Sequence, residues 1–573
     1  MSKVHDIVIR IGGESGEGVI STGELLTLAA ARAGLWVHTF RTYPAEIKGG
    51  HAVFQLRVSD QPLYSHGDNL NALLAFNQEG YDMHHQDLRP DGTVVFDTEQ
   101  VDESTVKESR KFPLPLSRIA KEEIKMPLAK NMVALGALAR LFSIPEDYTH
   151  KLCREKFAKK GDAVIQKNLE ALTAGKKYIE ENFTDLEQFR IQVAPSELRL
   201  VLSGNEAIGM GALVAGCTHY FGYPITPASD IMEFLAIELP KVGGIMMQVE
   251  DEIAALAMAV GASYSGKKCM TATSGPGLSL MTELLGLAGM AEVPVVVADI
   301  QRAGPSTGMP TKTEQGDLNL AAFGAHGESP RIVISPMSVE DCFYQTVNAF
   351  NLAERYQVPV LLLSDQALAT RTECIPKPDL KKVKVFDRVV HRDGAENNNY
   401  LRYQYTEDGV SPMALPGTSG GAYVATGLEH SEGGRPRYDP VTHQKMTDKR
   451  FRKLASAVAD FPRVDVLGDA DAELGIVGWG STLGAIREAT ERARAKGIRI
   501  ASFYPRVLYP LPDGYLLDQL KDVKRLIVPE INSQGQFANL LEQRYRGELI
   551  RYNIYGGLPF RPGEILKKIE EVA

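Results

Sequence analysis

Short apolar runs recur along the chain, and each is followed by a turn and then by a stretch with helical character. Three of these runs are 267–273 (KKCMTAT), 294–300 (PVVVADI) and 358–365 (VPVLLLSD). Runs of this kind are typical of parallel strands that are covered by helices on both faces of a sheet. The 52 glycines fit the many tight strand-to-helix turns that such a fold needs. The sequence therefore predicts an α/β protein built from three doubly wound domains.

The strand–turn–helix pattern sets the domain boundaries. The first domain is predicted over residues 1–185, a linker over 186–197, and the second domain over 198–375, beginning with the strand RLVLSG at 199–204. Residues 376–460 are rich in Gly, Pro, Asn, His and Tyr, and we expect an irregular connecting segment there. A third, smaller domain is predicted over 461–573, with strands in ELGIVGWGS (473–481), IRIASFYPRVLYP (498–510) and KRLIVPEIN (524–532).

Charge and hydropathy exclude several classes of protein. The chain has 63 basic and 72 acidic residues, so its formal charge is −9, which argues against a nucleic-acid binder. No apolar run approaches the ~20 residues of a membrane span. The first residues lack the pattern of a secretory signal. We therefore expect a cytoplasmic protein that binds neither nucleic acid nor a membrane.

The five cysteines are scattered, with no CxxC pair among them: Cys153, Cys217, Cys269, Cys342 and Cys374. This spacing disfavours a zinc site or an iron–sulfur cluster in this chain. We expect reduced, mostly buried thiols.

A glycine-rich turn, Gly12–Gly18, lies between the first predicted strand and helix. Backbone N–H groups at such a turn can bind an anion. The order of glycines is not GxGxxG, no P-loop lysine follows, and Glu14 and Glu17 would repel a phosphate. A structural turn is the favoured interpretation, and dinucleotide binding remains a remote alternative.

The segment 221–230 (FGYPITPASD) holds two prolines around Ile225 and Thr226. Prolines fix the backbone on either side, and a helix is predicted to follow. A hydroxyl held in such a turn, at the carboxyl end of a strand, can point into the crevice where α/β proteins bind ligands. Thr226 is therefore either a ligand-binding residue or part of a turn and helix cap.

Three acids, Glu250, Asp251 and Glu252, precede the helix IAALAMAVGA. Acids in a first helical turn are stabilised by the helix dipole, which is the simplest explanation of the cluster. The helix behind them is apolar nearly all round, so we expect it to be buried and to draw at least one acid into the interior. A buried carboxylate requires a specific partner.

Two further turns follow strands of the same predicted sheet: 271–277 (TATSGPG) and 299–308 (DIQRAGPSTG). Arg302 comes directly after an apolar strand, where a guanidinium can clamp a carboxylate. The alternative is a structural ion pair with Glu252 or Asp299. We expect Thr226, the buried acid and Arg302 to converge at strand ends of one sheet.

These residues carry a resemblance. The signatures GNEAIGMGALVAGC, YPITPAS, VEDEIAALAMAVGA, TATSGPGLSLM and IQRAGPSTGMPT resemble the pyrimidine-binding domain of thiamine-diphosphate enzymes, and most closely that of the 2-oxoacid:ferredoxin oxidoreductases. The first domain looks like the gamma subunit of that family, fused ahead of the alpha subunit. The region from Glu473 resembles a transketolase-C-terminal-type domain. The resemblance is weakest over 376–460.

The resemblance implies roles for individual residues. Glu252 and Gly261 have the nine-residue spacing of the cofactor glutamate and a helical glycine in many thiamine enzymes. Such a glutamate hydrogen-bonds the aminopyrimidine ring and favours its imino form, so Glu252 is the implied catalytic residue. Thr226 and Arg302 are the implied binders of the 2-oxoacid. The other implied cofactor-binding residues are Tyr223, Pro224, Ile225, Ser274 and Gly275.

Two parts of the family's machinery are missing from the sequence. The motifs DGTVV, DGVSP and DGYLL lack the glycine of a GDG diphosphate–magnesium motif. The resemblance therefore implies that Mg²⁺ and a [4Fe–4S] cluster lie on a separate beta subunit, in an (αβ)₂ assembly that reduces ferredoxin. Coenzyme A, the implied co-substrate, is assigned to Asn532 and Gln534. The turn 478–481 is a second candidate, and plain turn geometry is the alternative for both.

The expected function is CoA-dependent oxidative decarboxylation of 2-oxoglutarate to succinyl-CoA and CO₂, a reaction that is reversible in principle. The fused layout favours 2-oxoglutarate by resemblance only, and pyruvate or a branched-chain 2-oxoacid is the near alternative. A dinucleotide-dependent dehydrogenase and a non-catalytic scaffold subunit are the remote alternatives.

Overall fold

The computed structural model describes residues 5–44, 49–184, 186, 198–391, 400–469, 471–511 and 513–573. The chain divides into two compact units. The first unit is Met1–Leu202 with Thr370–Lys377 and Arg561–Gly563, and the second is Ser203–Ala369 with Pro378–Phe560 and Glu564–Ala573. The predicted linker 186–197 lies outside the described residues, apart from residue 186.

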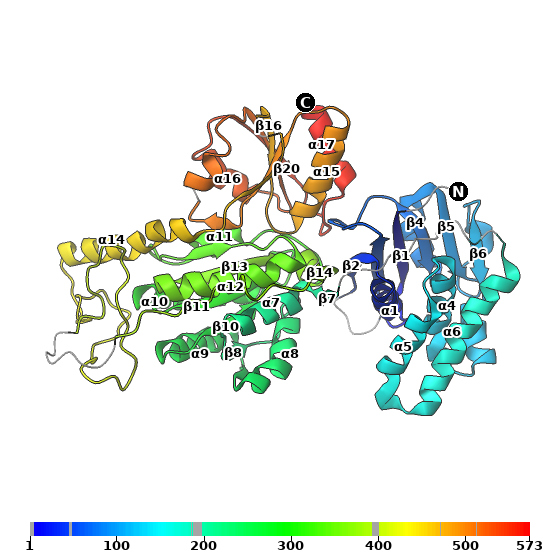
Figure 1. Ribbon diagram of the computed structural model, residues 1–573, viewed down its shortest axis with the longest axis horizontal. Coiled ribbons are helices and arrows are strands. Elements are labelled where there is room, and N and C mark those ends of the chain that lie inside the picture. Colours follow the sequence, from blue (N-terminus) through cyan, green and yellow to red (C-terminus); the bar gives the residue numbers. More distant parts are fainter. Residues whose placement is uncertain are drawn as a thin grey trace. The chain divides into compact units, whose positions relative to one another are not determined.

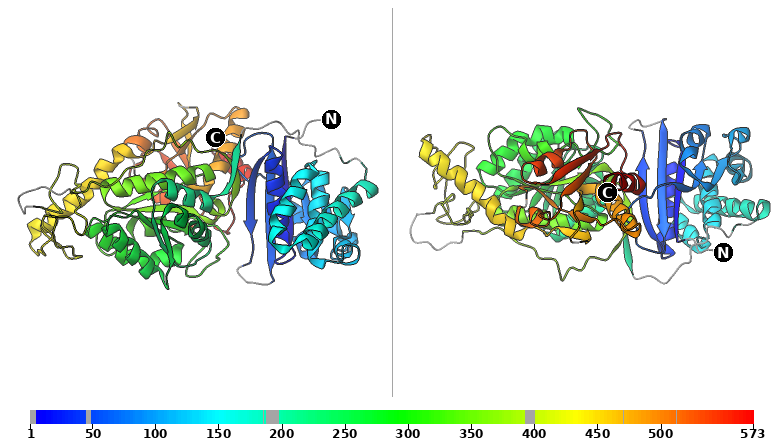
Figure 2. Two further views of the ribbon diagram at one scale, coloured as in Figure 1. Left: turned by 60° about the horizontal axis from the view of Figure 1, so that its bottom comes forward. Right: turned by 90° about the horizontal axis from the view of Figure 1, so that it is seen from above.

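The first unit contains an eight-stranded sheet in the order β6-β5-β4-β1-β3-β2-β14-β7. Its strands are β1 (Asp6–Glu14), β2 (Trp36–Thr42), β3 (His51–Ser59), β4 (Leu70–Ala75), β5 (Leu88–Asp97), β6 (Lys111–Leu114), β7 (Arg199–Ser203) and β14 (Thr372–Pro376). The strands β1, β4, β5 and β6 are parallel, whereas β3 runs antiparallel to both β1 and β2. The main apolar core of this unit lies between the sheet and the helices that cover one face of the sheet (Figure 2). The helices that form this core are α1 (Val19–Arg32), α3 (Leu116–Arg118), α4 (Lys130–Leu141), α5 (Glu146–Phe157) and α6 (Asp162–Asn182), whereas α2 (Gln78–His84) packs in a separate apolar cluster that contains Tyr81 and Val8.

The strands β7 and β14 differ from the prediction, because the run RLVLSG was expected in the second domain. Both instead extend the first unit's sheet beyond β2. Arg199 of β7 stacks on the ring of Trp36 at 3.8 Å, and the backbone N–H of Thr372 donates to Oγ1 of Thr39 at 2.8 Å. These cross-strand contacts with β2, which are distant in sequence, determine the sheet to which the two strands belong.

The second unit contains a seven-stranded sheet in the order β18-β12-β13-β11-β10-β8-β9 (Figure 1). Its strands are β8 (His219–Gly222), β9 (Ile245–Gln248), β10 (Cys269–Thr273), β11 (Val295–Gln301), β12 (Ile332–Ile334), β13 (Pro359–Asp365) and β18 (Val507–Tyr509). All are parallel except β18, which runs antiparallel to β12. The helices are α7 (Gly204–Val214), α8 (Ser229–Glu238), α9 (Glu252–Tyr264), α10 (Gly275–Met290), α11 (Leu318–Phe323), α12 (Val339–Tyr356) and α13 (Gln366–Ala369). The apolar runs fold as predicted, with β10, β11 and β13 fully buried.

A five-stranded sheet in the order β15-β17-β16-β19-β20 forms the C-terminal part of the second unit. Its strands are β15 (Asp465–Gly468), β16 (Leu474–Val477), β17 (Ala501–Tyr504), β19 (Arg525–Glu530) and β20 (Glu548–Asn553). Its helices are α15 (Leu483–Ala495), α16 (Gln536–Glu542) and α17 (Pro562–Val572). The predicted run 498–510 divides into β17, which stays in this sheet, and β18, which joins the seven-stranded sheet.

In the predicted irregular segment, 376–460, the described residues 377–391 and 400–439 form no helix or named strand. The segment nevertheless contains an 18-residue helix, α14 (Pro440–Ala457). The Asp439 side chain caps this helix by accepting from the backbone N–H of Thr442 at 2.9 Å, and Pro440 occupies its first turn. An Asp-Pro pair ahead of a charged stretch is a sequence signal for a helix start, and it identifies α14 in retrospect.

The helix α14 is attached through a buried charge cluster. Both carboxylate oxygens of Glu292 accept from Nζ of Lys449 at 2.7 Å, and Nζ of Lys453 contacts the same carboxylate. The guanidinium of Arg402 donates to the backbone carbonyl of Glu292 at 2.7 Å. Glu292, Lys449 and Lys453 are all 0% exposed. One carboxylate therefore binds two ammonium groups away from water, which joins α14 to the end of α10.

No helix in the part of the chain that the structure describes is both long enough and apolar enough to cross a bilayer. All five cysteines are buried and none forms a disulfide.

Candidate active site

Four neighbouring strands of the seven-stranded sheet end at one edge. The strands β11, β10, β8 and β9 are adjacent and mutually parallel, so their carboxyl ends lie side by side. The turns that follow them carry Arg302, Ser274, Thr226 and Glu252, in that order. The structure therefore brings the predicted substrate-binding and cofactor-binding segments to the same edge of the sheet.

Glu252 is the first residue of α9 and is only 6% exposed. Asp251 begins the helix by accepting from the backbone N–H of Ala254 at 2.7 Å, while Glu250 stays exposed. The three acids therefore have different roles, and Glu252 is the one drawn into the interior. Among the described residues no hydrogen-bond donor reaches its carboxylate.

Gly277, in the first turn of α10, makes room for this carboxylate. A Cβ atom at Gly277 would lie 2.6 Å from Oε1 of Glu252 and 2.0 Å from Oγ1 of Thr273. No residue with a side chain fits that space without displacing one of the two. The turn 274–277 is thus shaped to let a buried acid from α9 lie against it.

Arg302 is 8% exposed and follows β11 directly. Its two terminal nitrogens donate to backbone carbonyls, one to Thr226 at 2.6 Å and the other to Thr307 at 3.0 Å. Within the described residues Arg302 has no ion pair. The alternative prediction, a structural ion pair with Glu252 or Asp299, is therefore wrong. Burial lowers the pKa of this guanidinium, although a guanidinium remains charged at neutral pH. A buried cation without a counter-charge is a strong attractor for a ligand carboxylate.

The segment Tyr223–Thr226 faces the same edge. Tyr223 is 39% exposed, and the carbonyl of Ile225 accepts from the backbone N–H of Ser229 at 3.1 Å, which ties the turn to the start of α8. Thr226 is partly exposed, and its backbone is fixed by Arg302. The structure thus places Thr226 beside the guanidinium with which it was predicted to act.

Several polar atoms at this edge are buried and have no partner in the described part of the chain. They include Oγ of Ser274, Oγ1 of Thr271 and Nε of Arg302. Ser274 precedes α10 but does not cap it with its side chain. Buried polar atoms without partners are rare in folded proteins, so this edge is built to receive a polar ligand.

Asp317 is a further acid at this edge, and the sequence pattern does not single it out. Its carboxylate lies against Gly275, where a Cβ atom would be 2.7 Å from Oδ2. Asp299, on β11, is 0% exposed. Oδ2 of Asp317 and both carboxylate oxygens of Asp299 are buried without a partner in the described residues. The sequence marks these two residues only weakly: Asp299 is an acid near the end of an apolar strand, and Asp317 is an acid before a short helix.

The two C-terminal turns considered for coenzyme A are occupied by the chain's own carboxylates. The N–H of Ser481 donates to Oδ2 of Asp365 at 3.0 Å. The N–H groups of Phe537 and Ala538 donate to the carboxylate of Glu530 at 2.8 and 3.0 Å. These backbone groups are therefore already satisfied.

Asn532 and Gln534 lie differently from each other. Asn532 is 2% exposed, donates to the carbonyl of Gln315 at 3.0 Å and accepts from the N–H of Gly535 at 2.7 Å. Gln534 is exposed. Asn532 thus joins the two sheets of the second unit, and the assignment of coenzyme A to these two residues stays a prediction.

The glycine-rich turn of the first unit is likewise filled from within. Oε2 of Glu17 accepts from the backbone N–H of Glu14 and from the amide of Asn77, both at 2.8 Å, and Oε1 pairs with Lys130 at 3.1 Å. A glutamate occupies the position at which a phosphate would bind. This geometry favours the structural turn over dinucleotide binding.

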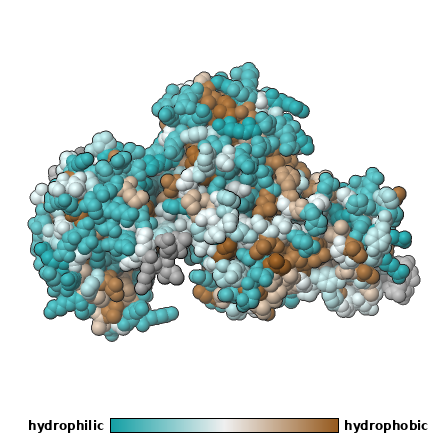
Figure 3. Space-filling model, turned by 180° about the vertical axis from the view of Figure 1, so that it is seen from behind, coloured by the Kyte–Doolittle hydropathy of each residue, from teal (hydrophilic) through white to brown (hydrophobic). Residues whose placement is uncertain are grey.

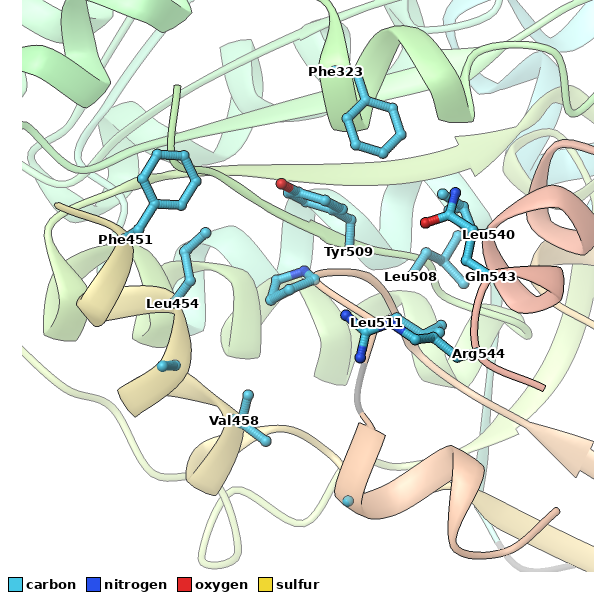
Figure 4. Close-up of a pocket in the computed structure, with 13 residues that line it drawn as sticks. Phe323, Phe451, Leu454, Val458, Leu508, Tyr509, Leu511, Leu540, Gln543 and Arg544 are labelled. Atoms are coloured by element: carbon cyan, nitrogen blue, oxygen red, sulfur yellow. The ribbon is translucent and has the colours of Figure 1, made fainter. Parts of the chain in front are cut away.

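A separate apolar cavity of about 440 Å³ lies among α11, α14, α16 and the end of β18 (Figure 4). Phe323, Phe451 and Tyr509 form its aromatic walls, and Arg544 stands at its polar end. It contains none of the residues that follow β8, β9, β10 or β11. It is therefore distinct from the candidate active site.

Family models match almost the whole chain. The model described as pyruvate flavodoxin/ferredoxin oxidoreductase, thiamine-diphosphate binding, matches residues 210–449. The model described as pyruvate ferredoxin/flavodoxin oxidoreductase matches 8–178. Core domain II of pyruvate:ferredoxin oxidoreductase matches 472–558. The match over residues 210–449 also extends over most of the predicted connecting segment.

Individual relatives agree. The chain is 34% identical to the 2-oxoglutarate oxidoreductase subunit KorA of Mycobacterium tuberculosis, over 98% of this chain and 91% of that one. It is 38% identical to the 2-oxoglutarate synthase subunit KorA of Methanocaldococcus jannaschii, over 64% of this chain and 98% of that one. A solved structure, the 2-oxoglutarate:ferredoxin oxidoreductase of Magnetococcus marinus with 2-oxoglutarate, coenzyme A and succinyl-CoA bound, is 44% identical with a TM-score of 0.94, over 99% of this chain and 100% of that one. The chain belongs to the 2-oxoacid:ferredoxin oxidoreductase family, as an alpha subunit.

Proposed function

We propose that this chain, together with a beta subunit, catalyses the CoA-dependent oxidative decarboxylation of 2-oxoglutarate to succinyl-CoA and CO₂, with reduction of ferredoxin. The observation that carries the proposal is Arg302, a buried guanidinium that forms no ion pair within the described residues, at the same sheet edge as the buried carboxylate of Glu252. The likeness to the Magnetococcus marinus enzyme, whose structure contains 2-oxoglutarate and coenzyme A, supports this choice of substrate.

The residues present fit thiamine diphosphate. Glu252 is a buried acid with no donor among the described residues, and the space over Gly277 keeps its carboxylate at the ligand-facing edge. Bound thiamine diphosphate supplies the nucleophilic carbon and the electron sink for decarboxylation. Glu252 holds and orients the protonated ring nitrogen of the aminopyrimidine. Ser274, Gly275 and Tyr223–Ile225 line the same edge, and the free hydroxyl of Ser274 offers a polar contact.

Arg302 and Thr226 serve the substrate. The guanidinium binds the 1-carboxylate of the 2-oxoacid, because it forms no ion pair with an acid of the described structure and is available to a ligand carboxylate. Its two bonds to backbone carbonyls, at 2.6 and 3.0 Å, hold it in place before the substrate arrives. Thr226, whose backbone carbonyl accepts from Arg302, is the residue whose hydroxyl we expect to donate to the substrate oxygens. Binding is thus preorganised, which keeps the 2-oxo carbon oriented for attack.

An apolar face around the site supports the proposal of a beta subunit. The sequence predicts α9 to be buried all round, but one side of it is exposed in this chain, with Ile253 at 49% and Met258 at 37%. The neighbouring edge strand β9 exposes Ile245 and Met247, and α10 exposes Leu280. Apolar surface gathers low on this unit in the space-filling view (Figure 3). A contiguous apolar face beside an unpaired edge strand is typical of a protein interface.

The proposal assigns the diphosphate, Mg²⁺ and the [4Fe–4S] cluster to that beta subunit. In the described ranges no three metal-ligating side chains lie together. Burial raises the pKa of the Cys217 thiol to about 12 and that of Cys153 to about 11, which suits structural thiols rather than cluster ligands. We further propose an (αβ)₂ assembly in the cytoplasm.

The test is an activity measurement on the complex purified from its host without oxygen. Viologen reduction is followed with 2-oxoglutarate, pyruvate and a branched-chain 2-oxoacid, each with and without coenzyme A. CoA-dependent reduction with 2-oxoglutarate as the best substrate is the expected result. Preference for another acid would overturn the substrate, and no activity with any acid would favour the scaffold subunit.

A further inference from the structure

The loop that follows Arg302 connects the candidate active site with the five-stranded C-terminal sheet of the same unit. It spans residues 303–317, between β11 and α11. Thr307 in this loop supplies one of the two carbonyls that hold the guanidinium, at 3.0 Å. The other carbonyl belongs to Thr226, in the turn before α8. The position of the guanidinium therefore depends on where the loop lies.

The first part of the loop is closed on itself by backbone hydrogen bonds. The N–H of Ala303 donates to the carbonyl of Lys312 at 3.0 Å, and the N–H of Met309 donates to the carbonyl of Ala303 at 2.9 Å. Gly308 has a φ of +56°, and a Cβ atom there would lie 1.9 Å from the carbonyl oxygen of Ala303. The stretch between Ala303 and Lys312 is thus a compact closed turn that carries Thr307.

The second part of the loop is held by Gln315, which is 0% exposed. Its backbone N–H donates to the carbonyl of Ile531 at 2.6 Å, and its side-chain Oε1 accepts from the N–H of Ile531 at 3.0 Å. Its Nε2 donates to the carbonyl of Trp479 at 2.9 Å, and its own carbonyl accepts from Nδ2 of Asn532 at 3.0 Å. One residue thus forms four hydrogen bonds with the turns that follow β16 and β19.

The residues on either side of Gln315 are bound by the same part of the chain. Nε2 of Gln536 donates to the carbonyl of Gly316 at 2.7 Å, and the N–H of Thr313 donates to the carbonyl of Gly557 at 3.3 Å. Buried hydrogen bonds of this kind are costly to break, because the freed polar atoms find no water. The C-terminal sheet therefore fixes the loop firmly at this end.

We propose that Gln315 is a positioning residue for the 2-oxoacid: it anchors the loop to the C-terminal sheet, and the anchored loop holds Arg302 in the orientation that binds the substrate carboxylate. This inference rests on the proposed function, in which Arg302 is the carboxylate clamp. A guanidinium forms two parallel bonds with a carboxylate only when its plane is fixed, so a small displacement lowers the affinity. The turn at Ile531 and Asn532 supports the substrate loop in this way.

The anchor acts on substrate binding rather than on the chemical step. Arg302 contacts the carboxylate that leaves as CO₂, so a loosened loop weakens the enzyme–substrate complex. Loss of the anchor should raise KM for 2-oxoglutarate by about tenfold, the lower end of the effect of one hydrogen bond to a charged group. The value of kcat should stay within about twofold of the wild type. Glu252 lies on a different turn of the sheet edge, so the affinity for thiamine diphosphate should not change.

Steady-state kinetics of complexes that carry Gln315→Leu test the proposal. Leucine fills the space of the glutamine side chain but forms neither of its hydrogen bonds. The matched control is Tyr545→Phe, which removes a hydrogen bond from Oη to the carbonyl of Val523, at 2.8 Å, in which the loop takes no part. Both variants should lower the midpoint of thermal unfolding, but only Gln315→Leu should raise KM. A wild-type KM in Gln315→Leu, or an equal rise in Tyr545→Phe, would overturn the proposal.

Combination with Arg302→Ala shows whether Gln315 acts through the guanidinium. In that background Gln315→Leu should change KM by less than about twofold, because the group that it positions is gone. A rise by the same factor in both backgrounds would indicate a general loss of structure and would overturn the inference. If Arg302→Ala alone left KM at the wild-type value, the proposed clamp itself would be wrong.

Gly308→Ala displaces the loop from its other end and is independent of the buried anchor. Gly308 is exposed, so this variant should fold even if Gln315→Leu does not. The added Cβ atom collides with the carbonyl of Ala303, so the closed turn opens and Thr307 moves away from Arg302. We expect the same rise in KM, with kcat and cofactor affinity unchanged. An unchanged KM in this variant would show that the loop does not position Arg302.

Discussion

Gly277 lies so close to Glu252 that a Cβ atom on the glycine would be 2.6 Å from the carboxylate oxygen Oε1. The glycine therefore decides where the buried acid of α9 can be. Oγ1 of Thr273 closes the other side of the same space, at 2.0 Å from that Cβ position. Glu252 cannot move away without leaving the ligand-facing edge, and Thr273 cannot move away because it lies on the buried strand β10.

Replacing Gly277 with alanine should displace Glu252 and weaken thiamine-diphosphate binding by at least tenfold. The matched control is Gly286→Ala on the same helix, where a Cβ atom meets nothing within 4 Å. That change should stabilise the chain by about 0.5–1 kcal/mol, because alanine is the better helix former. Calorimetric binding of the cofactor to the complex, with thermal unfolding beside it, separates the two effects. Equal cofactor affinity in both variants would disprove the role given to Gly277.

Glu252→Gln should abolish turnover, because the amide cannot hold a proton on the aminopyrimidine ring as the carboxylate does. Glu250→Gln is the control, since Glu250 is exposed two residues earlier. Both variants should keep the wild-type circular dichroism spectrum. If the Glu252 variant retained more than about a hundredth of the activity, the assignment of the cofactor glutamate would be wrong.

Arg302→Ala should raise KM for the 2-oxoacid by about 10- to 100-fold, which corresponds to the 1.5–3 kcal/mol of hydrogen bonds to a charged group. Arg302→Lys should recover part of this loss by charge alone, without the bidentate geometry. Steady-state kinetics over a range of 2-oxoacid concentrations measures the effect, with the exposed Arg463→Ala as control. An unchanged KM in Arg302→Ala would exclude the carboxylate clamp.

The cluster of Glu292 with two lysines should make stability depend on pH. Burial lowers the pKa of Lys453 to about 7. The positive charges of Lys449 and Arg402 also lower it, whereas the negative charge of Glu292 raises it. Between pH 7 and the unfolded value of about 10.4, the unfolded chain binds more protons, so stability rises with pH. Lys453→Met should reduce this rise, of which Lys449 keeps a part because burial lowers its pKa as well, and should increase stability at pH 6. Glu292→Gln should cost about 3–5 kcal/mol, because two ammonium groups are left buried without a counter-charge.

Chemical denaturation at pH 6 and pH 9 measures both effects. Lys445→Met, an exposed substitution on the same helix, is the control that should change neither value. If Lys453→Met were less stable than wild type at pH 6, the buried Lys453 ammonium would stabilise the fold, which would contradict this prediction.

Local patterns predicted which residues meet at this sheet edge, because each part of the edge is local in sequence. A buried strand, its turn and the next helix are contiguous in sequence, and parallel strands bring their turns to one edge regardless of detail. Thr226, Glu252 and Arg302 could therefore be expected together from their positions after β8, β9 and β11. The different positions of Glu250, Asp251 and Glu252 are local too, because all three residues lie at the start of one helix, α9.

Long-range contacts could not be predicted in the same way. The run that forms β7 resembles the strands of the second unit in sequence, and its pairing with β14 and its contact with Trp36 place it in the first sheet. The strand β18 lies within the predicted third domain yet pairs with β12. Asp317 precedes a six-residue helix, and its place at the site depends on Gly275, 42 positions earlier in the chain. These assignments depend on which surfaces meet, which a single sequence does not state.

The placement of β7 and β14 has a practical consequence for anyone who wishes to divide this polypeptide. Strands from 199–203 and 372–376 complete the sheet of the first unit, and the stretch between them folds in the second. The backbone therefore passes from one unit to the other and back, so a single cut cannot separate them cleanly. A truncated polypeptide that starts at residue 198 would carry a two-stranded ribbon without the sheet it extends, and such ribbons aggregate.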